Sequence, residues 1–217
     1  EIIHQISDGD ELIAIITRNR YGALVLNCSS ILFVDVDFPC LKPKGFFDSL
    51  SLFLNRKKRE AMQQAQVQET LDHIDKWADR HPQQSFRLYR TKEGLRLLFT
   101  DNLYEPTSEQ TTAILTELNA DPLYINLTQK QECFRARLNS KPWRCGCSRP
   151  PKSYPWDDDI AEKAFRKWAA SYDQREARYK VCDMIKEYGT PVEIPAIKKI
   201  TDIHDRAVRI TATAPMA

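Results

Sequence analysis

The sequence predicts an α+β fold in which one mostly antiparallel sheet carries packed helices. Three apolar segments follow one another within residues 11–38, and residues 85–101 alternate like a β-hairpin. Residues 55–80 and 108–119 have apolar side chains at helical spacing. Because the chain has 217 residues, we expect a single domain over residues 1–217, with a basic, Pro/Cys-rich irregular segment at about 139–156.

The first segments, "ELIAIITRN", "YGALVLN" and "SILFVDVDF", predict three strands separated by Gly22 and by residues 27–30. Residues 55–80 then predict a long amphipathic helix that ends at His81-Pro82. In residues 85–101 the apolar side chains alternate with polar ones on both sides of Lys92-Glu93-Gly94, so a tight turn is expected there.

A second helix is expected over residues 108–119, with Ser108 as its N-cap. Residues 121–138 also favour a helix, although "LYINL" is compatible with the start of a strand. Three aspartates at 157–159 predict the N-terminus of a helix running to about residue 171. Residues 177–189 fit either a strand or a helix, and the tail from residue 191 is ambiguous.

Composition narrows the classes of function. The net charge is only +2, so affinity for nucleic acid would have to come from local clusters of charge. No apolar run approaches the roughly 20 residues that span a bilayer, and no signal-peptide pattern opens the sequence. We therefore expect a cytoplasmic protein with no membrane partner; the first residue, Glu1, leaves open a longer native N-terminus.

The six cysteines favour reduced thiols over a disulfide framework, because the chain is long enough to build a core. Cys133, Cys145 and Cys147 offer three ligands for a structural zinc ion. Their spacing is not the usual CxxC pattern and no second pair completes a four-ligand set, so free thiols are the expectation.

The segment "ILFVDVDFP" places two aspartates in an otherwise apolar strand. Because side chains alternate across a strand, Asp35 and Asp37 share one face and lie about 6–7 Å apart. Burying such repelling carboxylates is costly, and a divalent Mg²⁺ or Mn²⁺ ion would offset that cost. The alternative is that each aspartate lies near the strand end and pairs with an arginine.

The hairpin supplies the complementary charge. Arg90, Lys92 and Arg96 lie close around its turn, where guanidinium groups and backbone amides can hold phosphate oxygens. The alternative is an ordinary solvent-exposed hairpin.

Together, "ILFVDVD" and "RTKEGLRLLF" resemble the two motifs of the archaeo-eukaryotic primase–polymerase superfamily. In that family an hhhDhD/E strand is followed by a strand pair carrying (T/S)-x-x-G-x-H. The resemblance implies an RRM-like primase–polymerase core, with Asp35 and Asp37 as metal ligands and Thr91, Gly94 and Arg96 lining the phosphates of a nucleotide.

The chain departs from the family pattern at Arg96, which stands where the family has histidine. The later acid is best assigned to Asp205 in "ITDIHDRAV", with Asp121 and Asp101 as weaker candidates. The predicted catalytic and metal-binding set is therefore Asp35, Asp37 and Asp205.

Residues 130–152 carry seven basic side chains against one acidic residue, Glu132. Cations neutralise phosphates and aromatic rings stack on bases, so this segment favours binding of a nucleotide or a single strand. The alternative is that Phe134 and Trp143 anchor the core beneath a solvated basic rim. The candidate phosphate ligands here are Arg135, Arg137, Lys141 and Arg144.

We therefore expect a divalent-metal-dependent nucleotidyltransferase of primase–polymerase type, using Mg²⁺ or Mn²⁺. Its expected partners are nucleoside triphosphates and single-stranded or primer–template nucleic acid. Three alternatives remain open: a metal-dependent phosphoesterase or nuclease, a non-catalytic nucleic-acid or nucleotide-binding module, and an interaction protein whose aspartates pair structurally with Arg90 and Arg96.

Overall fold

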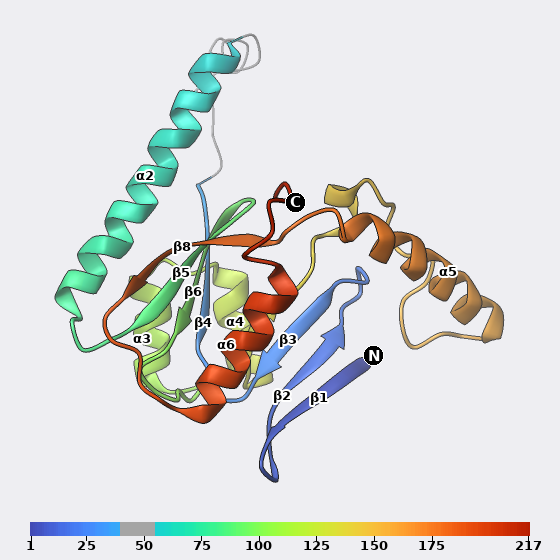
Figure 1. Ribbon diagram of the computed structural model, residues 1–217, viewed down its shortest axis with the longest axis horizontal. Helices are drawn as coiled ribbons and strands as arrows, with labels where there is room; N and C mark the ends of the chain where they lie inside the picture. Colours follow the sequence, from blue (N-terminus) through green and yellow to red (C-terminus); the bar gives the residue numbers. More distant parts are fainter. Residues whose placement is uncertain (40–54) are drawn as a thin grey trace.

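The computed structural model describes residues 1–39 and 55–217, which form two antiparallel sheets with helices around them (Figure 1). The first sheet has the order β1-β2-β3-β7 and the second the order β4-β6-β5-β8. The strands of the first sheet are β1 (Ile2–Asp8), β2 (Glu11–Arg18), β3 (Leu24–Cys28) and β7 (Phe134–Arg137). Those of the second are β4 (Phe33–Asp37), β5 (Phe86–Thr91), β6 (Gly94–Phe99) and β8 (Cys182–Tyr188).

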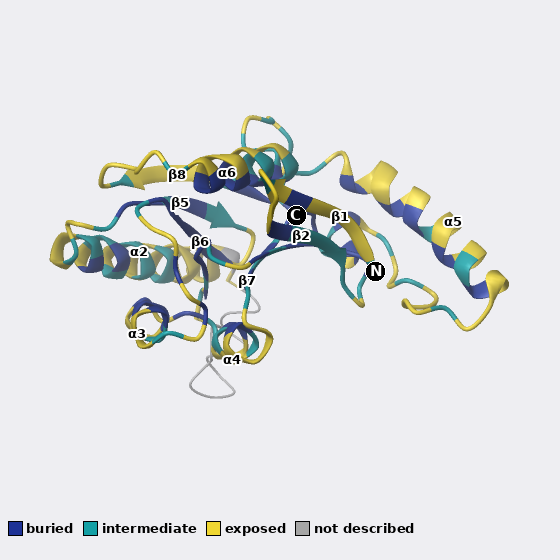
Figure 2. Ribbon diagram, turned by 90° about the horizontal axis from the view of Figure 1, so that it is seen from below, coloured by how far each residue is buried: buried dark blue, intermediate teal, exposed yellow. Residues whose placement is uncertain are grey.

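The helices are α2 (Arg56–Arg80), α3 (Glu109–Glu117), α4 (Pro122–Gln131), α5 (Asp159–Glu176) and α6 (Pro195–Val208), with a short 3-10 helix η1 (Pro142–Cys145). Figure 2 shows α6 on one side of the second sheet and α2, α3 and α4 on the other. Within the described residues, no helix is long and apolar enough to cross a membrane.

The main core lies around the second sheet. On the face covered by α2, the Trp77 ring lies 6.0 Å from the rings of both Phe86 and Phe99. On the opposite face, His204 of α6 packs 4.9 Å from Tyr89. The buried apolar cluster also includes side chains of the first sheet, such as Leu26, so one core joins the two sheets.

Most predicted elements are confirmed, including the α+β class, the three early strands, the hairpin and the capped helices. Ser108 accepts a hydrogen bond from Thr111 N, and Asp158 accepts one from Ala161 N, as their positions before α3 and α5 require. α5 continues to Glu176, beyond the predicted end at about residue 171.

Other predictions were incomplete or wrong. The strands form two sheets rather than one, and β1 was not predicted. Residues 121–138 are not one helix, because α4 ends at Gln131, the next residue Glu132 has a left-handed φ of 49°, and β7 follows. The ambiguous segment 177–189 contains β8, and the tail contains α6.

Candidate functional site

A cavity of about 160 Å³ lies beside the end of β4 and brings together side chains from distant parts of the chain. Its acidic residues are Asp35 and Asp37 of β4, Asp121 at the N-cap of α4, and Glu93. Its basic residues are Arg96, Arg137, Lys141 and Arg144. Thr91, Leu95 and Tyr124 complete the wall. The cavity therefore places carboxylates opposite four cationic groups.

The alternation of β4 explains how the aspartates reach this cavity. Val34 and Val36 are buried, whereas Asp35 and Asp37 share the other face of the strand. The N–H of Asp121 donates a hydrogen bond of 3.0 Å to the backbone oxygen of Asp35, which fixes the start of α4 against the strand.

Asp35 is paired with Arg96, its cross-strand neighbour on β6. Arg96 Nε donates to Asp35 Oδ1 at 2.7 Å, and Nη2 donates to Oδ2 at 3.2 Å. Arg96 is only 1% exposed. Burial acts to lower its pKa, but Asp35 outweighs that effect and the pKa of Arg96 is raised.

This pairing corrects the premise that a metal ion is needed to tolerate the two aspartates. The guanidinium of Arg96 already balances the charge of Asp35, and Asp37 is exposed at the strand end. Within residues 1–39 and 55–217, Asp37 makes no hydrogen bond or ion pair of its own. Partial burial, followed by repulsion from Asp121 and Asp35, raises the pKa of Asp37. A cation beside Asp37 would relieve that repulsion.

Arg137 is the least compensated cation of the cavity. Its Nε is buried and has no hydrogen-bond partner, and no described carboxylate forms an ion pair with it. Burial and the nearby guanidinium groups of Arg96 and Arg144 lower its pKa. A buried donor without an acceptor is costly, so this wall favours an anion.

Lys141 and Arg144 share a single acidic partner. Both contact Glu93 Oε2, with Lys141 Nζ at 3.8 Å, while the Glu93 side chain remains 65% exposed. One exposed carboxylate is incomplete compensation for two cations. These two side chains therefore extend the basic wall that begins at Arg137.

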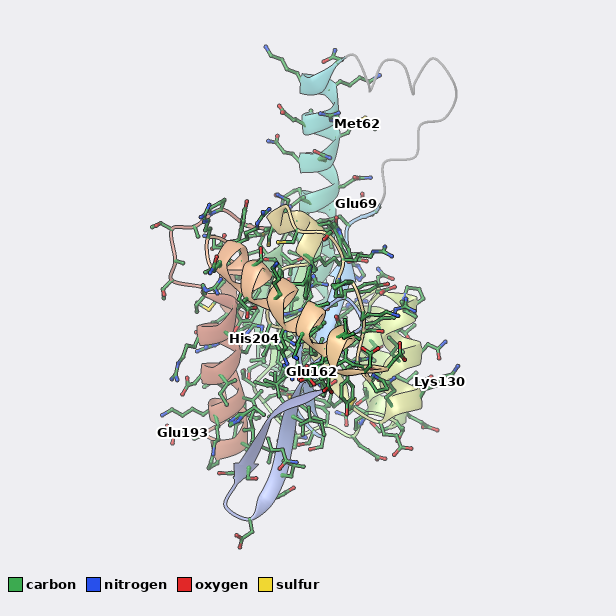
Figure 3. The ribbon with its side chains drawn as sticks, turned by 90° about the vertical axis from the view of Figure 1, so that its right-hand side faces the viewer. Met62, Glu69, Lys130, Glu162, Glu193 and His204 are labelled. Carbon is green, nitrogen blue, oxygen red and sulfur yellow. The ribbon has the colours of Figure 1, made fainter. Side chains whose placement is uncertain are left out.

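On the side of Arg96 away from the cavity, a series of buried polar contacts holds the Arg96–Asp35 ion pair in position. Arg96 Nη1 donates to the backbone oxygen of Arg137 at 2.9 Å and lies 3.4 Å from His204 Nε2. His204 Nδ1 lies 2.9 Å from Asp205 Oδ1. Burial, together with Arg96, outweighs the hydrogen bond to Asp205 and lowers the pKa of His204, which favours the neutral imidazole. Figure 3 shows His204 toward the middle of the molecule, whereas Met62 lies on the projecting end of α2.

Asp205, the predicted third metal ligand, does not line the cavity. Its carboxylate accepts hydrogen bonds from Tyr89 Oη at 2.7 Å and Arg87 Nη1 at 2.8 Å, in addition to its contact with His204. Burial acts to raise its pKa, but the hydrogen bonds from His204 and Tyr89 leave it lowered. Asp205 therefore lies outside the cavity and contacts it only indirectly, through His204 and Arg96.

Of the nine predicted phosphate ligands, four do not line the cavity: Arg90, Lys92, Arg135 and Gly94. Arg90 lies over the Phe38 ring, 4.0 Å from its centroid. Lys92 Nζ donates to the backbone oxygen of Met216 at 3.2 Å. Arg135 lines a different cavity, beside Cys133. By contrast, the predicted residues Thr91, Arg96, Arg137, Lys141 and Arg144 all line it.

Gly94 does not line the cavity. The close packing of β4 against β6 explains why this position has no side chain. A Cβ at this position would lie 2.2 Å from the backbone oxygen of Val36 on β4. Glycine therefore allows β4 and β6 to approach closely beside Asp37, its cross-strand partner.

Sequence reasoning ranked Asp121 behind Asp205, yet Asp121 lies in the cavity. The available signal was the Asp121-Pro122 pair, which is typical of a helix N-cap followed by proline at the first turn. Tyr124 was missed altogether. Its hydroxyl donates to the backbone oxygen of Phe33 at 2.7 Å and so packs α4 against the start of β4.

For the residues the structure describes, no group of three or more His, Cys, Asp or Glu side chains is arranged to hold a metal ion. The cysteines considered for zinc lie in different settings. Cys133 is next to the start of β7, while Cys145 is buried in η1 and Cys147 follows that helix.

No family model matches this chain, and comparisons with curated proteins and with solved structures likewise give no match.

Proposed function

We propose that the protein is a divalent-metal-dependent nucleotidyltransferase that binds a nucleoside triphosphate in the cavity between β4 and η1. The observation that carries this proposal is the meeting of Asp35, Asp37 and Asp121 with Arg137, Lys141 and Arg144 in one cavity. Nucleotidyl transfer needs both kinds of charge, because cations hold the phosphates while carboxylates hold the ion that bridges them.

The basic wall has the role of holding phosphate. Arg137 lines the cavity and has a buried Nε without a hydrogen-bond partner, a donor that a phosphate oxygen would satisfy. Lys141 and Arg144 exchange their shared contact with Glu93 for phosphate oxygens. Thr91 adds a hydroxyl at the turn. Arg96 orients the carboxylate of Asp35 through its two hydrogen bonds.

The acidic residues fit a Mg²⁺ or Mn²⁺ ion that is bound by only one or two protein carboxylates. Mg²⁺ is commonly held by one or two carboxylates together with substrate phosphates and water. Asp37 is free to serve in this way, and each Asp35 oxygen retains lone-pair capacity beyond its bond to Arg96. When bound, the ion would neutralise phosphate charge and activate the attacking hydroxyl.

The proposed acceptor is a single-stranded or primer–template nucleic acid, in line with the basic segment that borders the cavity. A cytoplasmic location is part of the proposal. In its support, the five cysteines within the described residues are free thiols, as expected in a reducing compartment.

The Arg96–Asp35 pair favours a second candidate, a nucleotide-binding module without catalysis. A carboxylate held at both oxygens by a buried guanidinium needs no metal ion for charge balance. Such a module would bind triphosphate through the basic wall equally well with and without a divalent cation.

One calorimetric experiment distinguishes the nucleotidyltransferase from the binding module. Wild-type protein is titrated with ATP in the presence of Mn²⁺ and again in the presence of EDTA. We expect Arg137→Gln to weaken binding about tenfold or more under both conditions, because charge-assisted hydrogen bonds are lost. We expect Asp37→Asn to weaken binding only when Mn²⁺ is present.

Asp10→Asn, at an exposed position in the turn between β1 and β2, is the matched control for the loss of one carboxylate. Lengthening of a labelled oligonucleotide with Mn²⁺ and triphosphates, abolished by Asp37→Asn, would complete the assignment. Metal-independent ATP binding without lengthening would instead select the binding module. No ATP binding by the wild type would refute both.

A further inference from the structure

Beside the cavity, the exposed ring of Trp143, the half-buried ring of Tyr21 and several cations form a cluster, which we call the Tyr21–Trp143 platform. Tyr21 comes from the turn between β2 and β3, and Trp143 from η1. Their ring centroids lie 5.5 Å apart with an interplanar angle of 86°. Trp143 is 44% exposed, so it is not the core anchor that the alternative interpretation of this segment required, whereas Phe134 is fully buried.

Cations surround both rings. The Arg149 guanidinium lies 5.3 Å from the centroid of Tyr21 and 5.5 Å from that of Trp143. Arg20 lies 5.4 Å from the Tyr21 centroid, and Lys141 Nζ lies 5.7 Å from the Trp143 centroid. In the part of the chain that the structure describes, neither Arg20 nor Arg149 forms an ion pair. The platform therefore carries positive charge that its own side chains do not neutralise.

Two sets of contacts hold the platform in place. Asn19 Oδ1 accepts hydrogen bonds from the backbone N–H groups of Tyr21 and Ala23, at 2.9 and 3.1 Å. At Gly22, which has a φ of +84°, a Cβ would lie 2.2 Å from the Trp168 ring of α5. The turn that carries Tyr21 is thus packed closely on α5.

The other half of the platform is fixed by the same helix. Trp168 Nε1 donates to the backbone oxygen of Ser148 at 3.0 Å, and Arg175 Nη1 donates to that of Gly146 at 2.6 Å. Trp143 and Arg149 flank these anchored residues. Because the rings are positioned before any ligand arrives, binding would cost little ordering entropy.

From these observations we infer that the Tyr21–Trp143 platform binds single-stranded nucleic acid and leads the strand to the cavity. This inference rests on the proposed function, since Lys141 belongs to both the platform and the cavity wall. Exposed rings and guanidinium planes stack on bases, and the unpaired cations neutralise the backbone. A single strand fits better than a duplex, because paired bases are already stacked on each other and cannot reach the rings.

The test is fluorescence anisotropy with labelled 20-nucleotide oligo(dT) and oligo(U), measured in EDTA so that no metal site contributes. We expect the wild type to bind a single strand more tightly than the matching duplex, with an affinity that falls as salt rises. Trp143→Ala should weaken binding about tenfold, within the range for losing one stacked base, and Trp143→Phe should retain most of it. The two oligonucleotides separate DNA from RNA preference.

Tyr154→Ala is the matched control, because Tyr154 is also an exposed aromatic of the basic segment, at 55%, but its ring contacts Trp156 instead. We expect this variant to bind like the wild type. Equal affinity of Trp143→Ala and wild type, or equal affinity for duplex and single strand, would overturn the inference. ATP binding by the wild type is measured separately, so failure of the platform and failure of the triphosphate site remain distinguishable.

Discussion

At the residue scale, the key arrangement is the chain of groups from Asp35 through Arg96 to His204 and Asp205. Arg96 is fully enclosed and makes hydrogen bonds to a carboxylate and to a backbone oxygen. Each member of the chain is held by the next, so the position of the Asp35 carboxylate depends on side chains from β6 and α6. Two predictions about stability follow from this dependence.

The first concerns Arg96. Arg96→Met leaves Asp35 without its partner, and breaking a buried pair in this way typically costs about 3 kcal/mol. We expect a loss of that size in the free energy of unfolding, measured by urea denaturation. The double variant Asp35→Asn/Arg96→Met should lose less than the two single variants added together. Additive losses would contradict a direct interaction.

The second concerns His204. Its folded-state pKa is lowered by burial, so the unfolded chain takes up a proton more readily than the folded protein. The contribution to stability is complete above the unfolded pKa of about 6.5 and is lost as pH falls below it, with a slope of at most about 1.4 kcal/mol per pH unit. Urea denaturation from pH 7.5 to 5.5 should show this slope.

His204→Gln is the control for the pH dependence. The other histidines are on the surface or half-buried, so the variant should show a smaller decrease of the free energy of unfolding over the same interval. An unchanged slope would mean that His204 does not contribute. Asp205 titrates at lower pH, since its own pKa is lowered, and does not enter this interval.

At the element scale, the approach of β4 to β6 sets the width of the site. Asp35 pairs with Arg96 and Asp37 with Gly94 in the same ladder, so the register of these two strands decides which side chains meet. A slip by one residue would turn both aspartates to the opposite face, into the apolar core.

Gly94→Ala tests this geometry. The added Cβ would overlap the Val36 backbone, so we expect a loss of about 1–3 kcal/mol in the free energy of unfolding. Lys92→Ala in the same turn is the control, because its side chain makes only a backbone contact at the surface. A fully stable Gly94→Ala variant with impaired ATP binding would favour the role in phosphate binding that sequence similarity implied.

At the scale of the whole molecule, the site lies where the two sheets meet. β4 and β6 supply Asp35, Asp37 and Arg96 from one sheet, while β7 supplies Arg137 from the other. The hydrogen bond from Arg96 Nη1 to the backbone of Arg137 joins them directly. The cavity therefore exists only when both sheets are folded and packed.

We expect the chain to unfold in a single cooperative transition, because one apolar cluster contains side chains of both sheets. Urea unfolding followed by far-UV circular dichroism and by tryptophan fluorescence should give coincident curves. Trp77 lies in the core of the second sheet and Trp168 lies near the first, so both regions contribute to the fluorescence signal. Two separated transitions would contradict the prediction of one domain over residues 1–217.

The sequence by itself determined the elements whose pattern is local. The alternation in β4, the hairpin around Lys92, the N-cap Ser108 and the helix start at the aspartates 157–159 depend only on neighbouring residues, and the structure has them where the pattern predicts. The same local pattern identified Asp35 and Asp37 as unusual. It could not define the end of α4, since residues 121–138 have no proline or glycine to separate helix from strand beyond Pro122.

Only the tertiary structure decided which charges meet. Asp205 and Asp121 are both aspartates, and their residue type does not tell which of them reaches the cavity. Long-range packing places Asp121 in the cavity, whereas Asp205 lies outside it and is held by Tyr89 and Arg87. The physical reason is that an ion pair depends on separation in space, and strand pairing and helix docking set that separation between residues far apart in the chain.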